Sequence, residues 1–220
     1  MVRAVVFGVG FAVPVTALAY VVRERVGPLI QVDDATIVAA TDLTRAHPSL
    51  LRALVLWQEA LRPVWVYLAG TGVCLWAWKR RGLRTRALWG FVTMMVAWNI
   101  ALDLKYVVQR ARPVVADPVS HAPGYSFPSG HAANSAAATT VVILLVWPLL
   151  GRRSRYAVLA GGVLVVAATA ADRVLLGVHY PSDVVAGVLV GSGLALASYL
   201  GYLGWSPGDP SADRSAGGSC

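Results

Sequence analysis

The sequence predicts an all-α protein, a polytopic membrane helix bundle with six transmembrane helices and an active site at the outer ends of the helices. Of its 220 residues, 57% are hydrophobic and 14% are charged, and the mean hydropathy is +0.61. These values are typical of membrane proteins rather than of soluble domains. Six apolar stretches each approach the roughly 20 residues that a helix needs to cross about 30 Å of hydrocarbon.

Each apolar stretch predicts one transmembrane helix, and the six in chain order are Val2 to Val22, Pro63 to Trp78, Ala87 to Leu104, Ala132 to Leu150, Tyr156 to Leu176 and Val184 to Leu203. The second is short, and the pattern from Pro48 onward predicts a helix that begins outside the bilayer and kinks near Pro63. The first has another interpretation as a cleaved signal peptide, with Arg3 at its start and Ala17-Leu18-Ala19 as the cleavage site. Its apolar run is longer than the core of a usual signal peptide, which favours a retained helix.

Two segments outside these stretches are predicted not to cross the membrane. The first runs from Asp33 to Ala46 and predicts an amphipathic helix on the outer leaflet, with an apolar face of Ile37, Ala40 and Leu43. The tail from Ser206 to Cys220 is rich in Gly, Ser, Pro and Asp, a composition typical of disorder. The sequence therefore predicts one membrane domain over residues 1–205 and a disordered tail over 206–220.

Basic residues crowd two short loops on the same side of the predicted bundle. They are Lys79, Arg80, Arg81, Arg84 and Arg86 after the second span, and Arg152, Arg153 and Arg155 after the fourth. Because short cytoplasmic loops carry an excess of Lys and Arg, both loops are predicted to be cytoplasmic. The opposite helix ends then lie on the extracytoplasmic face of the cell membrane. This bias and the site explain the net charge of +8, so no nucleic-acid partner is predicted, and the oligomeric state stays open.

The first group of candidate site residues follows the third span. If that helix continues past Lys105, Arg112 lies seven residues further along the same face, two turns away. Two long cationic side chains can converge from there on one phosphate. Pro113 disfavours helical geometry at Arg112 and marks the helix end. Arg110 lies outside this motif and is expected to snorkel to the membrane interface.

A second group, Pro128-Ser129-Gly130-His131, stands immediately before the fourth span. Ser129 suits an N-cap, Gly130 allows close backbone approach, and the free N–H groups of a helix start bind anions. The segment therefore predicts a phosphate-binding site at the start of this helix, with His131 at its edge. A bound phosphate dianion would keep a proton on His131, which suits a general acid for the leaving alcohol.

A third group, Arg173, His179 and Asp183, spans the connection between the last two predicted helices. Pro181 suits the first turn of the final helix, so Asp183 can point back to the ring of His179 and fix its tautomer. The other ring nitrogen is then free to attack phosphorus. Arg173 is expected to be a bidentate phosphate clamp. Fixed cations, two histidines and one carboxylate make up a phosphoryl-transfer site with a histidine nucleophile.

With these three motifs, at these spacings and in this order, the chain resembles the type 2 phosphatidic acid phosphatase superfamily of membrane lipid phosphatases. Tyr125-Ser126-Phe127 and the run from Gly177 to Asp183 are similar to its bacterial members. The resemblance covers roughly residues 87 to 200. It implies six helices, in-line attack by His179, a phosphohistidine intermediate, and hydrolysis by water. Lys105, Arg112, Arg173 and the amides around Ser129 and Gly130 would stabilise the equatorial oxygens, and the site would need no metal or other cofactor.

The substrate implied is a lipid phosphate: phosphatidic acid, phosphatidylglycerol phosphate, undecaprenyl diphosphate or another polyprenyl phosphate. An alternative of another class is a transporter or binding protein for an anionic solute, although such proteins place charged or helix-breaking residues near mid-span. A third, a vanadate-dependent haloperoxidase, shares the motifs but belongs to larger soluble proteins. The six spans argue against it.

One position departs from the family. Asp172 stands where serine usually precedes the motif arginine. A carboxylate facing the phosphate would oppose binding, so Asp172 is expected to point away, to pair with Arg173 or Lys105, or to indicate an altered substrate.

Overall fold

The computed structural model describes residues 2–115 and 118–205, and every regular element in these ranges is helical. The elements are α1 Val2–Arg23, α2 Gly27–Ala46, α3 Pro48–Ala60, α4 Pro63–Arg81, α5 Arg84–Val108, α6 Gly130–Val146, the 3-10 helix η1 Trp147–Leu149, α7 Arg152–Leu175 and α8 Pro181–Trp205. The all-α prediction is confirmed for this part of the chain. The predicted disordered tail, Ser206 to Cys220, lies outside the described residues.

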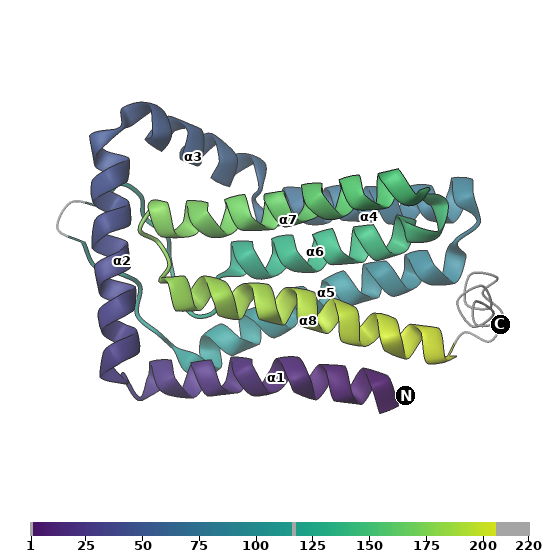
Figure 1. The fold of residues 1–220 in the computed structure, drawn as a ribbon, viewed down its shortest axis with the longest axis horizontal. Coiled ribbons are helices and arrows are strands. Elements are labelled where there is room, and N and C mark those ends of the chain that lie inside the picture. The colour runs from purple at the N-terminus through teal and green to yellow at the C-terminus, as the bar shows by residue number, and fades with distance from the viewer. Residues whose placement is uncertain (1, 116–117, 206–220) are drawn as a thin grey trace.

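Helix α2 crosses one end of a bundle whose helices run along the long axis of the molecule, namely α1, α4, α5, α6, α7 and α8 (Figure 1). The connections from α5 to α6 and from α7 to α8 lie at the end that α2 crosses. The connections from α4 to α5 and from α6 to α7 lie at the opposite end. The three groups of candidate residues therefore share one end of the bundle, as the alternation of spans predicts.

Five helical segments are long and apolar enough to cross a membrane: Val2–Arg23, Arg84–Val108, Gly130–Leu149, Arg152–Leu175 and Pro181–Gly204. The predicted second span, α4, is absent from this set among the described residues. It has 19 residues and its last turn is Lys79, Arg80 and Arg81, so any 18-residue window of it includes at least two charges. The break between α3 and α4, with Pro63 opening α4, confirms the predicted kink near that proline.

The closest helix pair, α6 and α8, places two of the motifs side by side. A Cβ added to Gly187 would lie 2.6 Å from the carbonyl oxygen of Ser129, and one on Gly191 would lie 2.1 Å from that of Ala133. Neither distance is tolerable, so glycine at both positions allows the backbones to approach, as small residues do in membrane helix pairs. At the helix starts, the N–H of Ser129 donates to the carbonyl of Asp183 at 2.9 Å.

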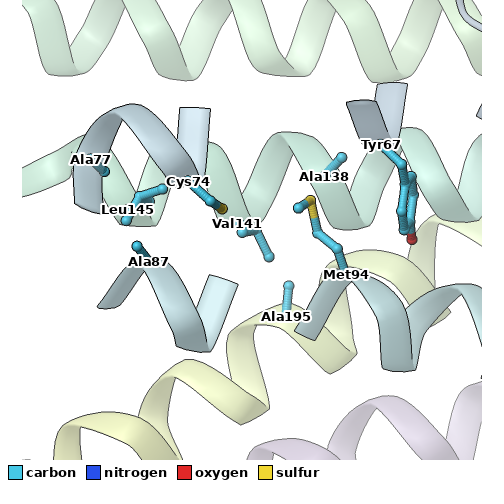
Figure 2. Packing of buried hydrophobic residues seen from close by; sticks show 9 residues of the cluster. All are labelled: Tyr67, Cys74, Ala77, Ala87, Met94, Ala138, Val141, Leu145 and Ala195. Atoms are coloured by element: carbon cyan, nitrogen blue, oxygen red, sulfur yellow. The ribbon is translucent and has the colours of Figure 1, made fainter. Parts of the chain in front are cut away.

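The main apolar core lies between α4, α5, α6 and α8 and consists mostly of small or flexible side chains (Figure 2). A Cβ on Gly70 of α4 would approach the Met94 sulfur to 2.7 Å, which explains how α4 packs so closely on α5. The hydroxyl of Tyr67 donates to Asn134 Oδ1 at 2.8 Å, an interhelical hydrogen bond between α4 and α6. This packing attaches α4 firmly to the bundle.

Helix α2 is longer than predicted, and its buried face is more polar. Of the predicted apolar face, Ile37 is buried, but Leu43 is 48% exposed. The other buried residues of α2 are Asp33, Thr41 and Thr44. Thr44 donates to the carbonyl of Leu175 at 2.8 Å. The predicted face is thus wrong, because the helix packs against the polar turn between α7 and α8 instead of presenting a purely apolar side.

Candidate active site

His179 lies at the centre of the cluster, in the turn between α7 and α8. Gly177 gives this turn its shape, with φ +69 and no room for a Cβ beside Thr41 of α2. The His179 side chain is buried, and its Nε2 lies 3.2 Å from Nη1 of Arg112. A guanidinium only donates hydrogen bonds, so Nε2 is the acceptor and the neutral ring carries its proton on Nδ1.

The ring of His179 is neutral near pH 7. Burial lowers the pKa of His179 to about 4, the Asp183 carboxylate opposes that shift, and the cations Arg112 and Lys105 add to it. A neutral imidazole has a free lone pair on Nε2. The chemistry expected of a histidine nucleophile is therefore available without prior deprotonation.

Asp183 lies on the other side of the ring together with Ser126, whose contact with this pair the sequence did not predict. Its Oδ2 is 3.7 Å from Nδ1 of His179, longer than a hydrogen bond. The Ser126 hydroxyl donates to the same Oδ2 and lies 3.4 Å from Nδ1. The N–H of Tyr180 also donates to Oδ2, at 2.9 Å. Asp183 thus lies beside the Nδ1 side of the ring as predicted but makes no direct hydrogen bond to it, and Ser126 contacts both residues.

Lys105 and Arg112 converge on the cluster by a different route from the predicted one. The helix ends at Val108, and Gln109 takes φ 52 with its N–H bonded to the carbonyl of Lys105. The expectation of one helix face continuing to Arg112 is therefore wrong, because this left-handed residue closes α5. Arg112 instead reaches in from the following loop and donates to the carbonyl of Val178 at 2.7 Å.

Lys105 lies against the second motif. Its Nζ donates to the carbonyl of Tyr125 at 2.8 Å, and its Cε lies 3.8 Å from the position of a Cβ on Gly130. The flexible ammonium is thus beside the start of α6, where a phosphate oxygen could meet both the lysine and the helix-start amides.

His131 and Ser129 provide two polar atoms at the start of α6. Ser129 occupies the N-cap position but makes no side-chain capping hydrogen bond. Its Oγ and the Nε2 of His131 are buried and have no hydrogen-bond partner among the described residues. Buried polar atoms are nearly always paired, so these two are suited to ligand oxygens. His131 also lies within electrostatic range of Arg173, His179 and Arg112.

Arg173 is held by neighbours on its Nε–Nη2 edge. Asp172 Oδ2 accepts from Nε at 2.7 Å and also from Nη2, while Gln58 of α3 accepts from Nη2 at 2.9 Å. Of the three expectations for Asp172, the structure shows pairing with Arg173. The bidentate clamp predicted for Arg173 is not free on this edge, because Asp172 occupies it.

The prediction for Arg110 is wrong. Instead of snorkelling to the interface, its side chain is 8% exposed and lies between Asp33 and Asp183, 2.7 Å from a carboxylate oxygen of each. The loop after α5 turns inward beneath α2, which brings the guanidinium to two buried acids. A buried acid at position 33 has no signature in the sequence, since Asp33 and Asp34 look equally solvated there.

Within the described ranges, no group of three His, Cys, Asp or Glu side chains lies close enough together to hold a metal ion.

Comparison with known proteins identifies this arrangement. The family model of the PAP2 superfamily matches residues 86–205, more than half of the 220. The chain belongs to the PAP2 superfamily. The match contains the three motifs and the helices α5 to α8 that carry them, and the resemblance inferred from the motifs is confirmed.

Individual PAP2 proteins are similar over parts of the chain. Decaprenylphosphoryl-5-phosphoribose phosphatase of Mycobacterium tuberculosis is 36% identical over 131 residues, which are 58% of this chain and 66% of that protein. Phosphatidylglycerophosphatase B of Bacillus subtilis is 35% identical over 91 residues, 40% of this chain and 44% of that one. This chain thus spans just under two thirds of the mycobacterial relative.

A solved structure shows the same fold. The PAP2 type transmembrane phosphatidylglycerolphosphate phosphatase of Bacillus subtilis superposes with a TM-score of 0.78, covering 92% of this chain and 98% of that one at 20% identity. The superposition includes the helices N-terminal to residue 86, which the family model does not reach. The five helices described above that are long and apolar enough to cross a membrane make this chain a membrane protein.

Proposed function

We propose that this chain is an integral membrane lipid phosphatase that removes a terminal phosphate from a phosphomonoester or diphosphate of a lipid through a phosphohistidine intermediate. The observation that carries the proposal is His179, a buried neutral histidine whose Nε2 accepts from Arg112. Relatives named as lipid phosphatases support the same reaction class.

In the first chemical step, Nε2 of His179 attacks phosphorus and the bond from phosphorus to the lipid oxygen breaks. Arg112 already touches Nε2, so a phosphoryl group bound there would meet its guanidinium at once. Lys105 and the amides at the start of α6 approach from another side, and Arg173 from the end of α7. Such preorganised donors stabilise the charge that spreads over the equatorial oxygens.

Proton movements fall to the two histidines. His131, as the imidazolium that a bound phosphate dianion favours, gives its proton to the departing lipid oxygen. Phosphorylated His179 carries positive charge on its ring, and Asp183 stabilises it. In the second step neutral His131 takes a proton from water, which attacks phosphorus and releases inorganic phosphate with His179 restored.

The experiment that tests this function is a panel of phosphates in detergent micelles with free phosphate as the readout. The panel holds phosphatidic acid, phosphatidylglycerol phosphate, undecaprenyl diphosphate and a polyprenyl phosphoribose 5-phosphate, with glycerol phosphate as the non-lipid control. Release from at least one lipid, well above glycerol phosphate, is expected. Release from none of the lipids would contradict the proposed function.

The protein should be inhibited by vanadate and unaffected by EDTA. Vanadate adopts the five-coordinate geometry of an in-line transition state, and the cations that would stabilise that geometry are side chains rather than metal ions. Phosphate release measured with each additive checks this. Complete loss of release with EDTA, restored by Mg²⁺ or Zn²⁺, would contradict the metal-independent mechanism.

We also propose that α4 crosses the membrane together with the five apolar helices, which makes six spans, and that the site lies on the extracytoplasmic face of the cell membrane. The supporting observations are the attachment of α4 within the core and the basic loops at the end remote from the site. A reporter fused after Arg81 should be cytoplasmic, and one inserted near Val119 should be outside. Finding both reporters on one side would contradict the six-span topology.

A further inference from the structure

Helix α2 takes part in the site through one buried acid. Asp33 is 1% exposed, and its Oδ2 accepts from Nη2 of Arg110 at 2.7 Å. Its Oδ1 accepts from the backbone N–H of Ser182 at 3.1 Å, one residue before Asp183. An isolated buried carboxylate is costly. Asp33 is therefore held as half of an ion pair with Arg110.

Arg110 continues the connection to Asp183. Its Nη1 donates to Asp183 Oδ1 and to Ser182 Oγ, both at 2.7 Å. The guanidinium also lies 4.0 Å from the ring centre of Tyr180, so it is fixed by stacking as well as by hydrogen bonds. The result is a chain of buried charges, Asp33–Arg110–Asp183, that ends one contact from His179.

The two oxygens of Asp183 have separate partners. Arg110 donates a hydrogen bond to Oδ1, while the Ser126 hydroxyl and the N–H of Tyr180 donate to Oδ2. The carboxylate is fully buried. With each oxygen held, the carboxylate cannot rotate, and Oδ2 remains on the side of Nδ1 of His179. The orientation of the catalytic pair thus depends on the Arg110 guanidinium, which donates to Asp183, Ser182 and Asp33.

We propose that Arg110 and Asp33 are positioning residues for the His179–Asp183 pair, with Arg110 fixing the Asp183 carboxylate and Asp33 supplying the charge that balances Arg110. This inference rests on the proposed function. Without Asp33, Arg110 would neutralise Asp183 and weaken its stabilisation of a phosphorylated, positively charged His179. With Asp33 present, the three groups together carry one net negative charge beside the ring.

The balance predicts opposite pH effects for two substitutions. The charged and titratable groups that face His179 are Lys105 of α5, Arg112 of the next loop, His131 of α6 and Asp183 of α8, and these stay the same in both variants. Arg110→Gln removes a nearby cation, which raises the pKa of His179. Asp33→Asn removes an anion, which lowers it.

The test measures kcat, KM and the acid limb of kcat/KM in the purified full chain. Arg110→Gln should lower kcat by about tenfold and move the limb up by about one pH unit, while KM changes less than about twofold. Asp33→Asn should lower kcat by about threefold to tenfold and move the limb to lower pH. Arg110→Lys retains the positive charge but lacks the planar guanidinium that binds both carboxylates. It should lower kcat and leave the acid limb at its wild-type pH.

Exposed residues of the same helix provide matched controls. Asp42 and Arg45 form a solvent-exposed pair on α2, so Asp42→Asn and Arg45→Gln make the same chemical changes away from the site. Both should retain wild-type kcat and pH profile. Asp33→Asn and Arg110→Lys preserve side-chain size or charge, and thermal unfolding in detergent verifies that each is folded.

Two results would overturn the inference. One is wild-type kcat in Asp33→Asn and in Arg110→Gln. The other is an acid limb that moves in the same direction in both variants. A general loss of packing could cause that result, because its effect does not depend on whether a cation or an anion is removed. A wild-type protein that releases no phosphate from any lipid would instead count against the proposed function, so the two failures are distinguishable.

Discussion

His179→Ala is expected to abolish phosphate release, with a loss of at least about 10⁴-fold in kcat. The reason is that the Nε2 of His179 lies against Arg112 while Asp183 lies on the other side of the ring, an arrangement that suits a nucleophile. His131 is the second histidine of the cluster, but it lies at the start of α6, where it suits proton transfer to the leaving oxygen. Steady-state phosphate release from the best lipid of the panel is the measurement.

The companion variant His131→Ala separates the two roles. The first step should slow by about 10²- to 10⁴-fold with a lipid alkoxide as the leaving group. It should slow much less with an aryl phosphate, whose leaving group needs no proton, and the initial burst of aryl alcohol measures this step. His47→Ala is the matched control, because His47 is exposed at the junction of α2 and α3. Turnover near the wild-type level in His179→Ala would contradict the nucleophile assignment.

Asp172→Ser is expected to lower kcat/KM by about tenfold to a hundredfold, although serine is the residue that the family usually has there. The Asp172 carboxylate holds two nitrogens of Arg173, and serine cannot hold both. A hydrogen bond to a charged group is worth about 1.5 to 3 kcal/mol, which corresponds to roughly this range of rates. Kinetics at two ionic strengths measure the effect.

The opposite account of Asp172 makes a different prediction from the same experiment. If the carboxylate repels the phosphate, Asp172→Ser should lower KM for a dianionic substrate, and the gain should shrink as salt screens the charges. Asp172→Asn is the informative control, since it retains an acceptor of the same shape without the charge. Unchanged kcat and KM in Asp172→Ser would contradict both accounts.

The sequence was most informative where chemistry requires particular residues at particular spacings. The order of apolar stretches and loops predicted that residues 105, 131, 173, 179 and 183 meet at one end, and the structure brings them there. Helix ends were less predictable. The seven-residue spacing favoured a continuous helix from Lys105 to Arg112, but Gln109 adopts a left-handed conformation and ends α5. Glutamine has no preference for this conformation, so the sequence did not predict the helix end.

Residues that act through others were the hardest to find. The role of Arg110 depends on partners in α2 and α8, which are distant from it in the chain. Gln58 supports Arg173 from α3 in the same way. Such roles depend on tertiary contacts between buried charges, for which one sequence has no periodic signal. The predicted apolar face of α2 failed for the same reason, because Asp33 is buried by its ion pair rather than by its hydropathy.

A covalent phosphate on His179 is the central claim. His131→Ala with an aryl phosphate should make the intermediate accumulate, because bond breaking to that leaving group needs no acid while hydrolysis of the phosphoenzyme still needs a base. Peptide mass spectrometry after an alkaline quench, which preserves phosphohistidine, should place one phosphate on His179 and none in the His131→Ala, His179→Ala double variant. A phosphate on any other residue, or rapid phosphate release from the double variant, would contradict the proposed mechanism.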